Sequence, residues 1–408
     1  KGKSASMLRS QRARAVARWG RCRRRHLSVT PGFYRVQTPF GKFPETVSGG
    51  LVDNAVEFRK LRPGDHIQVP YEVTIDDNVR VFWQSAFYAH ERINTSTPFA
   101  TALGFKDQLL PFPLLLFLAG SMSHADAAKM QIAYSNAYYC YPAYAGDTFR
   151  KEFVVKKVRT TSDKEQSIMT FGCRLLNQQD RVIFHCDKVM LFPFPRDDEA
   201  AGEYMPVQPV DGLMGAFATR SSVLGELGNQ SVTPLRPGQL ILHSLQRPLT
   251  DTQSRQLSTL ARLTHERHFD SLQYPQQSDR YIPGGLIVGM LMSASSRDFH
   301  EVLHEAIPNC SFIRKVHPGD SVGAISFITD LQEDVGGDLE SITVRTIGVK
   351  NFAVRDLRGR QIPTKLFTEP RLQQSSIDAI LEGTDLGDLG DRIVVAADRK
   401  ILRQSPRH

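Results

Sequence analysis

One segment of the chain has the spacing of a metal site: His300-Glu301-Val302-Leu303-His304 matches the HExxH pattern. On a helix, this spacing places two zinc ligands on one face beside a glutamate that can act as a general base. Pro308 ends any helix within about one turn of His304, and the sequence offers no evident third ligand. We therefore favour a chance polar helix end over a zinc peptidase site, and we expect no metal.

Other chemistry-bearing patterns are weak. The five cysteines form no CxxC pair and predict buried, reduced thiols rather than disulfides or a zinc site. No GxGxxG, Walker or GxSxG motif occurs, so dinucleotide, nucleoside triphosphate and serine-hydrolase chemistry lack support. A tyrosine cluster is more typical of a core than of a nucleotide platform; its members are Tyr134, Tyr138, Tyr139, Tyr141 and Tyr144.

The chain contains an internal repeat. Three motifs recur in the same order at offsets of 173 to 175 residues, which indicates a duplicated unit of about 130 residues. The pairs are Leu61-Arg62-Pro63-Gly64 with Leu235-Arg236-Pro237-Gly238, His90-Glu91-Arg92 with His265-Glu266-Arg267, and Ala145-Gly146-Asp147 with Pro318-Gly319-Asp320.

Each copy repeats one order of elements. A short strand follows the LRPG turn, then N-cap residues at 74–77 or 250–252 precede a helical stretch. An apolar helix with small residues comes next, and alternating β-branched and aromatic residues then predict three antiparallel strands. This order predicts an α+β fold in which an antiparallel sheet wraps around a central helix.

The repeat also suggests domain boundaries. We expect an N-terminal copy at 61–195, a linker at 196–234, a C-terminal copy at 235–368 and a polar, peripheral tail at 369–408. The longest apolar run, Leu109 to Leu118, is too short to span a bilayer and contains two prolines. No membrane span is therefore expected.

The positive charge lies at one end of the chain. Ten of the 51 Lys and Arg residues fall within residues 1–30, which hold no acid, so 41 basic residues remain against 43 acidic ones. An Arg-rich, acid-free arm is typical of a mitochondrial transit peptide. The alternative is a basic tail that grips RNA. We expect import into the mitochondrial matrix, with no DNA partner.

The order of elements resembles the MaoC-like double hot-dog superfamily, closest to the mitochondrial type 2 3-hydroxyacyl-thioester dehydratases. The resemblance covers about 61–368 and is strongest in the second copy. Its motifs are His265-Glu266-Arg267-His268-Phe269-Asp270, Pro283-Gly284-Gly285-Leu286-Ile287-Val288 and Ser311-Phe312-Ile313-Arg314. The resemblance implies two tandem hot-dog domains.

The resemblance also implies roles for individual residues. His268 takes the position of the catalytic histidine, with a polar loop histidine as the alternative, and Glu266 or Asp270 could orient it or share its proton. Gly284 and Gly285 begin the helix that polarises the thioester carbonyl. Arg314 and Lys315, on and after the last of these motifs, are the expected contacts to the thioester carrier.

Two departures weaken the enzymatic interpretation. Leu263 stands five residues before His268, where the family carries Asp or Asn, and the family's Val-His-Gly histidine is missing after Val288. The first copy departs further, with Ile93 or Asn94 at the histidine position, and is expected to lack catalysis.

Two functions follow. The first is a lyase of mitochondrial fatty-acid synthesis, a (3R)-3-hydroxyacyl-thioester dehydratase or enoyl-thioester hydratase. It would act on acyl-CoA or acyl carrier protein thioesters without a cofactor. The second is a catalytically degenerate structural or assembly component, for example of the mitochondrial ribosome. The expected partner is either a second copy of the chain, in a homodimer, or a mitoribosomal complex.

Overall fold

The computed structural model describes residues 57–406, apart from 89–90, 122–127, 197–201, 208, 228–231, 334 and 337, together with residues 46, 48 and 49. The expected targeting arm (residues 1–30) and His90 of the repeated motif lie outside the described residues.

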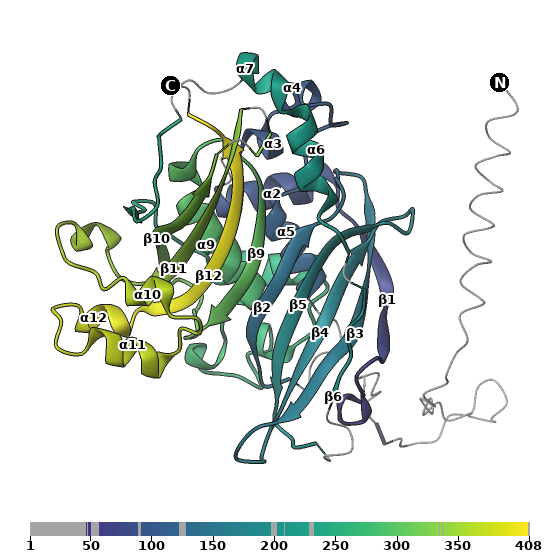
Figure 1. The fold of residues 1–408 in the computed structure, drawn as a ribbon. Helices are drawn as coiled ribbons and strands as arrows, with labels where there is room; N and C mark the ends of the chain where they lie inside the picture. Colours follow the sequence, from purple (N-terminus) through teal and green to yellow (C-terminus); the bar gives the residue numbers. More distant parts are fainter. Residues whose placement is uncertain are drawn as a thin grey trace, which may run out of the picture. The chain divides into compact units, whose positions relative to one another are not determined.

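A single antiparallel sheet runs through the described chain, in the order β1-β3-β4-β5-β2-β9-β12-β11-β10-β7 (Figure 1). The order reads as two mirrored sets of five strands, one from each copy. The first set is β1 His66–Thr74, β2 Met130–Tyr139, β3 Thr148–Thr160, β4 Ser167–Leu176 and β5 Val182–Phe192. The second is β7 Leu240–Leu242, β9 Val302–Phe312, β10 Ser321–Gln332, β11 Leu339–Lys350 and β12 Ile393–Gln404.

The two copies join where β2 pairs with β9. Tyr134 lies opposite Cys310 and Ser135 opposite Asn309, so backbone hydrogen bonds continue from one half of the sheet into the other. Two short strands pair with the strands next to the ends of this order: β6 Gly202–Glu203 pairs with β3, and β8 Arg247–Pro248 pairs with β10. The halves therefore share one sheet.

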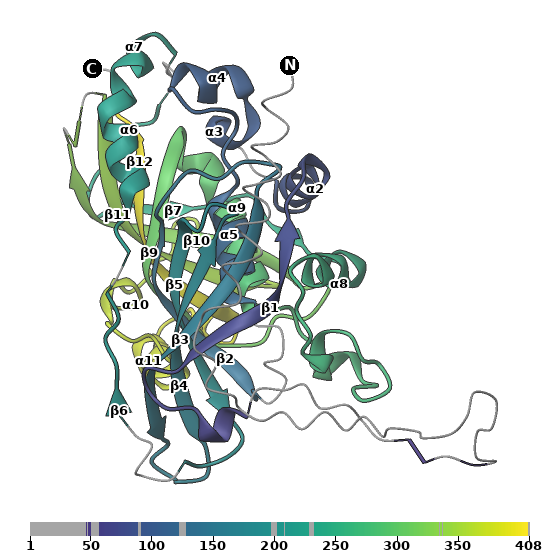
Figure 2. The same ribbon diagram turned by 90° about the vertical axis from the view of Figure 1, so that its right-hand side faces the viewer.

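Each half wraps its strands around one apolar helix, which confirms the predicted α+β class (Figure 2). These helices are α5 Phe112–Gly120 and α9 Gly284–Phe299. Every residue of α5 except Pro113 is buried, as expected for a helix that is apolar on all sides. A Cβ added to Gly285 of α9 would lie 2.6 Å from Cδ2 of Phe117, so glycine permits the close approach of α9 to α5.

A more exposed helix precedes each central helix, and the predicted caps are present. Asp76 Oδ1 accepts a hydrogen bond from Val79 N at the start of α2 Asp77–Phe87. Thr250 forms a capping box with Gln253 at the start of α8 Asp251–Leu260. Shorter elements complete these layers: η1 Phe58–Lys60, α3 Arg92–Thr95, α4 Thr97–Ala102, η4 Glu266–His268 and η5 Gln277–Asp279.

The prediction of a peripheral tail at 369–408 is wrong, because β12 lies within the sheet between β9 and β11. Between β11 and β12 the chain forms η6 Val354–Leu357, α10 Lys365–Thr368, α11 Gln374–Leu381 and α12 Gly387–Gly390. Apolar side chains of these short helices, such as Phe367 and Ile377, pack with Ile347 of β11 in a separate core cluster. This helical insertion separates the last strand from the others in sequence.

The expected linker also carries structure. It contains α6 Gly212–Arg220, η3 Ser221–Val223 and α7 Leu224–Leu227. Asp211 caps α6 and also lies 2.8 Å from Nε2 of His304 in β9. No helix within the described residues is long and apolar enough to cross a membrane.

Buried ion pairs hold β12 in place. Arg399 is fully buried, and its Nε and Nη2 donate to the two carboxylate oxygens of Glu305 at 2.9 and 2.8 Å. Removing one member of such a pair leaves an uncompensated buried charge. The neighbouring Lys400 is exposed.

We expect Arg399→Ala to lower the free energy of unfolding by about 3–5 kcal/mol, because Glu305 would keep its buried charge without a partner. Lys400→Ala, on the same strand, is the control and should change it by less than about 0.5 kcal/mol. Urea unfolding followed by circular dichroism measures both. Equal effects would contradict a structural role for the buried pair.

Candidate functional site

A cavity of about 60 Å³ brings together residues from both copies. The second copy contributes His268 and the start of α9, and the first copy contributes β2, β5 and the end of α5. We call it the His268 cavity. Its lining includes Phe117, Gly120, Gln131, Tyr134, Lys188, Leu263, His265, His268, Tyr281, Gly284 and Gly285.

The ring of His268 is fixed by one hydrogen bond. Its Nδ1 lies 2.8 Å from the carbonyl oxygen of Tyr281, and because a carbonyl only accepts, Nδ1 carries the proton. Nε2 then keeps its lone pair. Burial, and next the nearby His265, lower the pKa of His268 from 6.5 to about 3. The ring is therefore neutral at pH 7 and can accept a proton at Nε2.

His265 has a different role, because both its nitrogens are engaged. Nε2 lies 2.8 Å from the carbonyl oxygen of Ala128 in the first copy, and Nδ1 accepts from Arg267 N at 3.3 Å. This arrangement anchors the loop of the second copy to the first. His265 therefore positions the His268 loop and has no free nitrogen for proton transfer.

The start of α9 supplies backbone donors to the cavity. Pro283 precedes the helix, and its carbonyl accepts from Leu286 N and Ile287 N. The N–H groups of Gly284 and Gly285 belong to the first turn, where no intrahelical acceptor exists. Oriented first-turn amides stabilise a developing negative oxygen. Both predicted glycines thus lie in the cavity wall, while their role stays a prediction.

The carboxylates predicted beside His268 do not reach it. Glu266 is exposed, and Asp270 Oδ1 accepts from Leu272 N at 2.7 Å and Gln273 N at 3.0 Å within its own turn. The Tyr281 carbonyl orients the ring instead. Among the described residues no Asp or Glu lines this cavity. The assignment of Glu266 or Asp270 as partners is therefore wrong in this geometry.

The two residues predicted to contact the thioester carrier, Arg314 and Lys315, have different neighbours in the structure. Arg314 follows β9 and pairs with Asp391 at 2.6 Å, whereas Lys315 places Nζ 5.2 Å from the centre of the Tyr281 ring. Arg267, which sequence reasoning did not single out, lies 5.7 Å from the same ring. Two cations thus flank the residue whose carbonyl holds His268. Neither Arg314 nor Lys315 lines the cavity itself.

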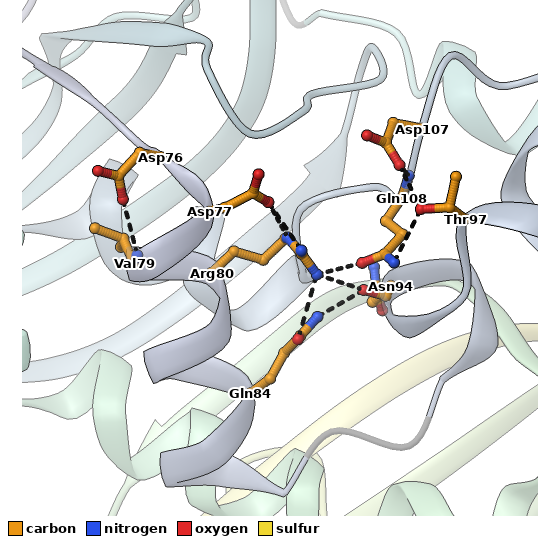
Figure 3. A network of polar contacts seen from close by, with 9 residues as sticks. All are labelled: Asp76, Asp77, Val79, Arg80, Gln84, Asn94, Thr97, Asp107 and Gln108. Carbon is orange, nitrogen blue, oxygen red and sulfur yellow. Dashed lines mark hydrogen bonds and ion pairs between the residues drawn. The ribbon is translucent and has the colours of Figure 1, made fainter.

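Asn94 occupies the position of His268 in the first copy, within the polar network of Figure 3. Its Nδ2 donates to the carbonyl oxygen of Leu109 at 2.8 Å. Leu109 lies three residues before α5, just as Tyr281 lies three residues before α9. The first copy therefore keeps the contact that fixes the loop. Its asparagine has an amide in place of the imidazole and so offers no basic nitrogen.

The rest of this network holds Asn94 from two sides (Figure 3). Gln84 Nε2 and Arg80 Nη1, both from α2, donate to the Asn94 carbonyl at 2.6 and 3.4 Å. Thr97 donates to Asp107 at 2.8 Å, and this hydrogen bond lowers the pKa of Asp107. These contacts describe a structural junction of α2, α4 and the loop before α5.

The HExxH segment does not form a helix. His300 and Glu301 have φ angles of 43° and 49°, and β9 begins at Val302, so the two histidines do not share a helix face. Glu301 pairs with Arg92 at 2.7 Å, and His304 contacts Asp211 as described above. The described residues contain no cluster of three or more side chains that could hold a metal ion. The HExxH sequence therefore lies where α9 ends and β9 begins.

Comparisons with known proteins agree with this architecture. No family model matches the sequence. The chain is similar to a mesaconyl-CoA hydratase of Cereibacter sphaeroides, 23% identical over 328 residues, covering 75% of this chain and 94% of that protein. It also resembles the crystal structure of a putative MaoC domain protein dehydratase from Chloroflexus aurantiacus, with a TM-score of 0.70 and 18% identity over 88% of this chain and all of that one.

A second solved structure names the architecture. A conserved hypothetical protein of Mycobacterium tuberculosis, described as a double hot-dog fold, matches with a TM-score of 0.61 and 16% identity, covering 86% of this chain and 98% of that one. The chain therefore has the double hot-dog fold. In this fold the His268 cavity lies between the loop and helix of one hot-dog unit and strands of the other.

The depressed pKa of His268 predicts a pH-dependent stability. The unfolded chain binds a proton at this ring below about pH 6.5, whereas the folded chain resists protonation until about pH 3. Stability is therefore lost as pH falls through this window. We expect wild type to lose about 1–2 kcal/mol more than His268→Asn between pH 8 and pH 5, measured by urea unfolding at each pH. Parallel losses in the two proteins would contradict a ring that stays neutral in the folded chain.

Proposed function

We propose that the chain is a hydro-lyase that adds water to, or removes it from, the α,β bond of an acyl thioester. The observation that carries the proposal is the meeting of the free Nε2 of His268 and the first turn of α9 in one cavity. In hydration, Nε2 accepts a proton from water as the water oxygen bonds to the β-carbon. The Gly284 and Gly285 amides stabilise the enolate-like oxygen, and the proton is then delivered to the α-carbon.

In this proposal His268 carries the proton. His268 would take the proton from water and return it to the α-carbon, so hydration needs no second base. The fold of the solved relatives and the name of the curated relative, a hydratase of an acyl-CoA, support this class of reaction.

The thioester carrier of this proposal is coenzyme A or acyl carrier protein. Arg267 and Lys315 flank Tyr281, so two cations stand beside the loop that holds His268 and suit the phosphates of either carrier. The mitochondrial matrix remains our proposed location, on the composition of residues 1–30 alone.

We expect His268→Asn to fold like the wild type and to lower kcat/KM for trans-but-2-enoyl-CoA hydration by about 100-fold or more. Asparagine can keep the donor to the Tyr281 carbonyl, as Asn94 does in the first copy, but it has no second basic nitrogen. Loss of absorbance of the conjugated thioester measures the rate.

The control is His317→Asn. His317 makes the same kind of contact, with Nδ1 2.8 Å from the Arg280 carbonyl, but lies outside the cavity lining. It should retain activity. If wild type and His268→Asn were equally inactive on every enoyl thioester tried, the hydro-lyase proposal would fail and a structural or assembly role would be favoured.

We expect the double variant Arg267→Ala/Lys315→Ala to raise KM for acyl-CoA by about tenfold with little change in kcat, because two carrier contacts to phosphate are lost. The wild-type KM should rise with salt, and that of the variant should rise less. Lys365→Ala, an exposed lysine of α10, is the control. A lower kcat at unchanged KM would contradict a carrier-binding role.

A further inference from the structure

Lys188 places a primary amine in the wall of the His268 cavity. The side chain comes from β5, is only 5% exposed, and donates from Nζ to the Gly120 carbonyl at 2.6 Å. Gly120 and Lys188 both line the cavity, together with His268 and the start of α9. After burial and His265, the charge of Lys188 is a further cause of the lowered pKa of His268. The amine is therefore shielded from bulk water and close to the proposed site of the thioester.

Burial also makes this amine more nucleophilic than an exposed lysine. Desolvation lowers the pKa of Lys188 from 10.5 to about 8. The neutral amine carries the lone pair that attacks a carbonyl carbon, and desolvation is one way in which proteins activate a lysine. At pH 8 about half of the molecules hold a neutral amine at Lys188, whereas an exposed lysine is almost entirely charged.

The other half of the molecule has a guanidinium at the matching position. Asp187-Lys188-Val189-Met190-Leu191 of β5 corresponds to Asp398-Arg399-Lys400-Ile401-Leu402 of β12, the equivalent strand. Arg399 is fully buried and donates to Glu305. A guanidinium is not deprotonated in proteins, so Arg399 is no nucleophile. The lysine of the first half thus differs from its counterpart in chemistry as well as in surroundings.

The small size of the cavity keeps the amine near the start of α9. A volume of about 60 Å³ holds about four to six water-sized groups. Residues of β2 contact both of its ends. A Cβ added to Gly120 would lie 2.1 Å from Oη of Tyr134, and one added to Gly284 would lie 2.9 Å from Oε1 of Gln131. A thioester carbonyl held by the first-turn amides of α9 would therefore lie within a few heavy atoms of Lys188 Nζ.

We propose that Lys188 is an acyl-acceptor site, to which an acyl thioester bound in the His268 cavity transfers its acyl group. This inference rests on the proposed binding of acyl thioesters at this site. The neutral Nζ attacks the carbonyl carbon, and the Gly284 and Gly285 amides stabilise the oxyanion that forms. The C–S bond then breaks and the amine proton passes to the departing thiolate. The products are an amide on Lys188 and a free thiol.

Acylation of Lys188 switches the site off. The amide has lost the positive charge of the lysine, and its acyl chain fills a cavity of only a few water-sized groups. A second thioester then has no space beside His268. An amide is hydrolysed far more slowly than a thioester, so the modified chain stays inactive after the free thioester is consumed.

The test uses butanoyl-CoA, a saturated thioester that cannot be hydrated and therefore reports acylation alone. The full chain is incubated with it at pH 8, and mass spectrometry of the intact protein and of its peptides locates the added group. We expect one butanoyl group on Lys188, added at least about 100-fold faster than on the exposed Lys365, because thioester and amine share one cavity. The rate should saturate with butanoyl-CoA, and hydration of trans-but-2-enoyl-CoA should fall as Lys188 is modified.

The pH dependence identifies the reacting amine. Because the pKa of Lys188 is about 8, its rate of acylation should rise about tenfold between pH 7 and pH 9 and then level off. An exposed lysine should gain about 100-fold over the same range and continue to rise. A profile at Lys188 like that of an exposed lysine would overturn the proposal.

Two lysine positions separate the effect of the cavity from that of the lowered pKa. Lys188→Arg keeps a donor for the Gly120 carbonyl but has no nucleophilic amine, so its intact mass should stay unchanged while wild type takes up one group. Lys151 is the internal control. Burial lowers its pKa to about 7, but Nζ donates to the Ser121 and Ala261 carbonyls and the residue does not line the cavity. It should stay unmodified in wild type.

Hydration of trans-but-2-enoyl-CoA is measured separately, so the two proposals can fail independently. If wild type hydrates it while Lys188 takes up butanoyl no faster than Lys365, the acyl-acceptor site is overturned and the hydro-lyase proposal stands. If Lys188 is acylated selectively but no enoyl thioester is hydrated, the acyl-acceptor site stands and the hydro-lyase proposal fails. Modification of Lys151 as fast as Lys188 would also overturn the acyl-acceptor site, since a lowered pKa alone would then explain both.

Discussion

The pairing of β2 with β9 is the contact on which the site depends. It joins the sheets of the two copies with backbone hydrogen bonds, as at Tyr134 opposite Cys310. The loop and helix start of one copy thereby lie against the strands of the other. Neither copy holds a complete cavity by itself, because His268 and Lys188 come from opposite halves. Both copies therefore contribute to the architecture of the site.

The two halves keep the same backbone contacts while their charges differ. Asn94 and His268 each fix a loop to the carbonyl three residues before a central helix. Beyond that contact, only the histidine retains a basic ring nitrogen. The cations Arg399 and Lys188 occupy matching strand positions, yet only Arg399 has a carboxylate partner among the described residues.

The sequence determined the features that local patterns encode. The repeated motifs, the caps at Asp76 and Thr250 and the alternation of the strands were sufficient for the duplicated α+β architecture. The resemblance in the second copy also selected His268 and the Gly284-Gly285 helix start, which the structure brings into one cavity. These predictions succeeded because turns, caps and helix starts depend on residues that are close in sequence.

The tertiary structure decided whatever depends on long-range partners. Only the fold places β12 between β9 and β11, since the helices of the preceding insertion separate it from the other strands. Only packing turns Glu266 and Asp270 away from His268 and gives its Nδ1 to the Tyr281 carbonyl. The altered pKa of Lys188 depends on the fold in the same way, because only packing removes water from its ammonium group. The sequence specifies which ionisable side chains are present. The fold decides which neighbours they contact, and these neighbours alter their pKa and hydrogen bonding.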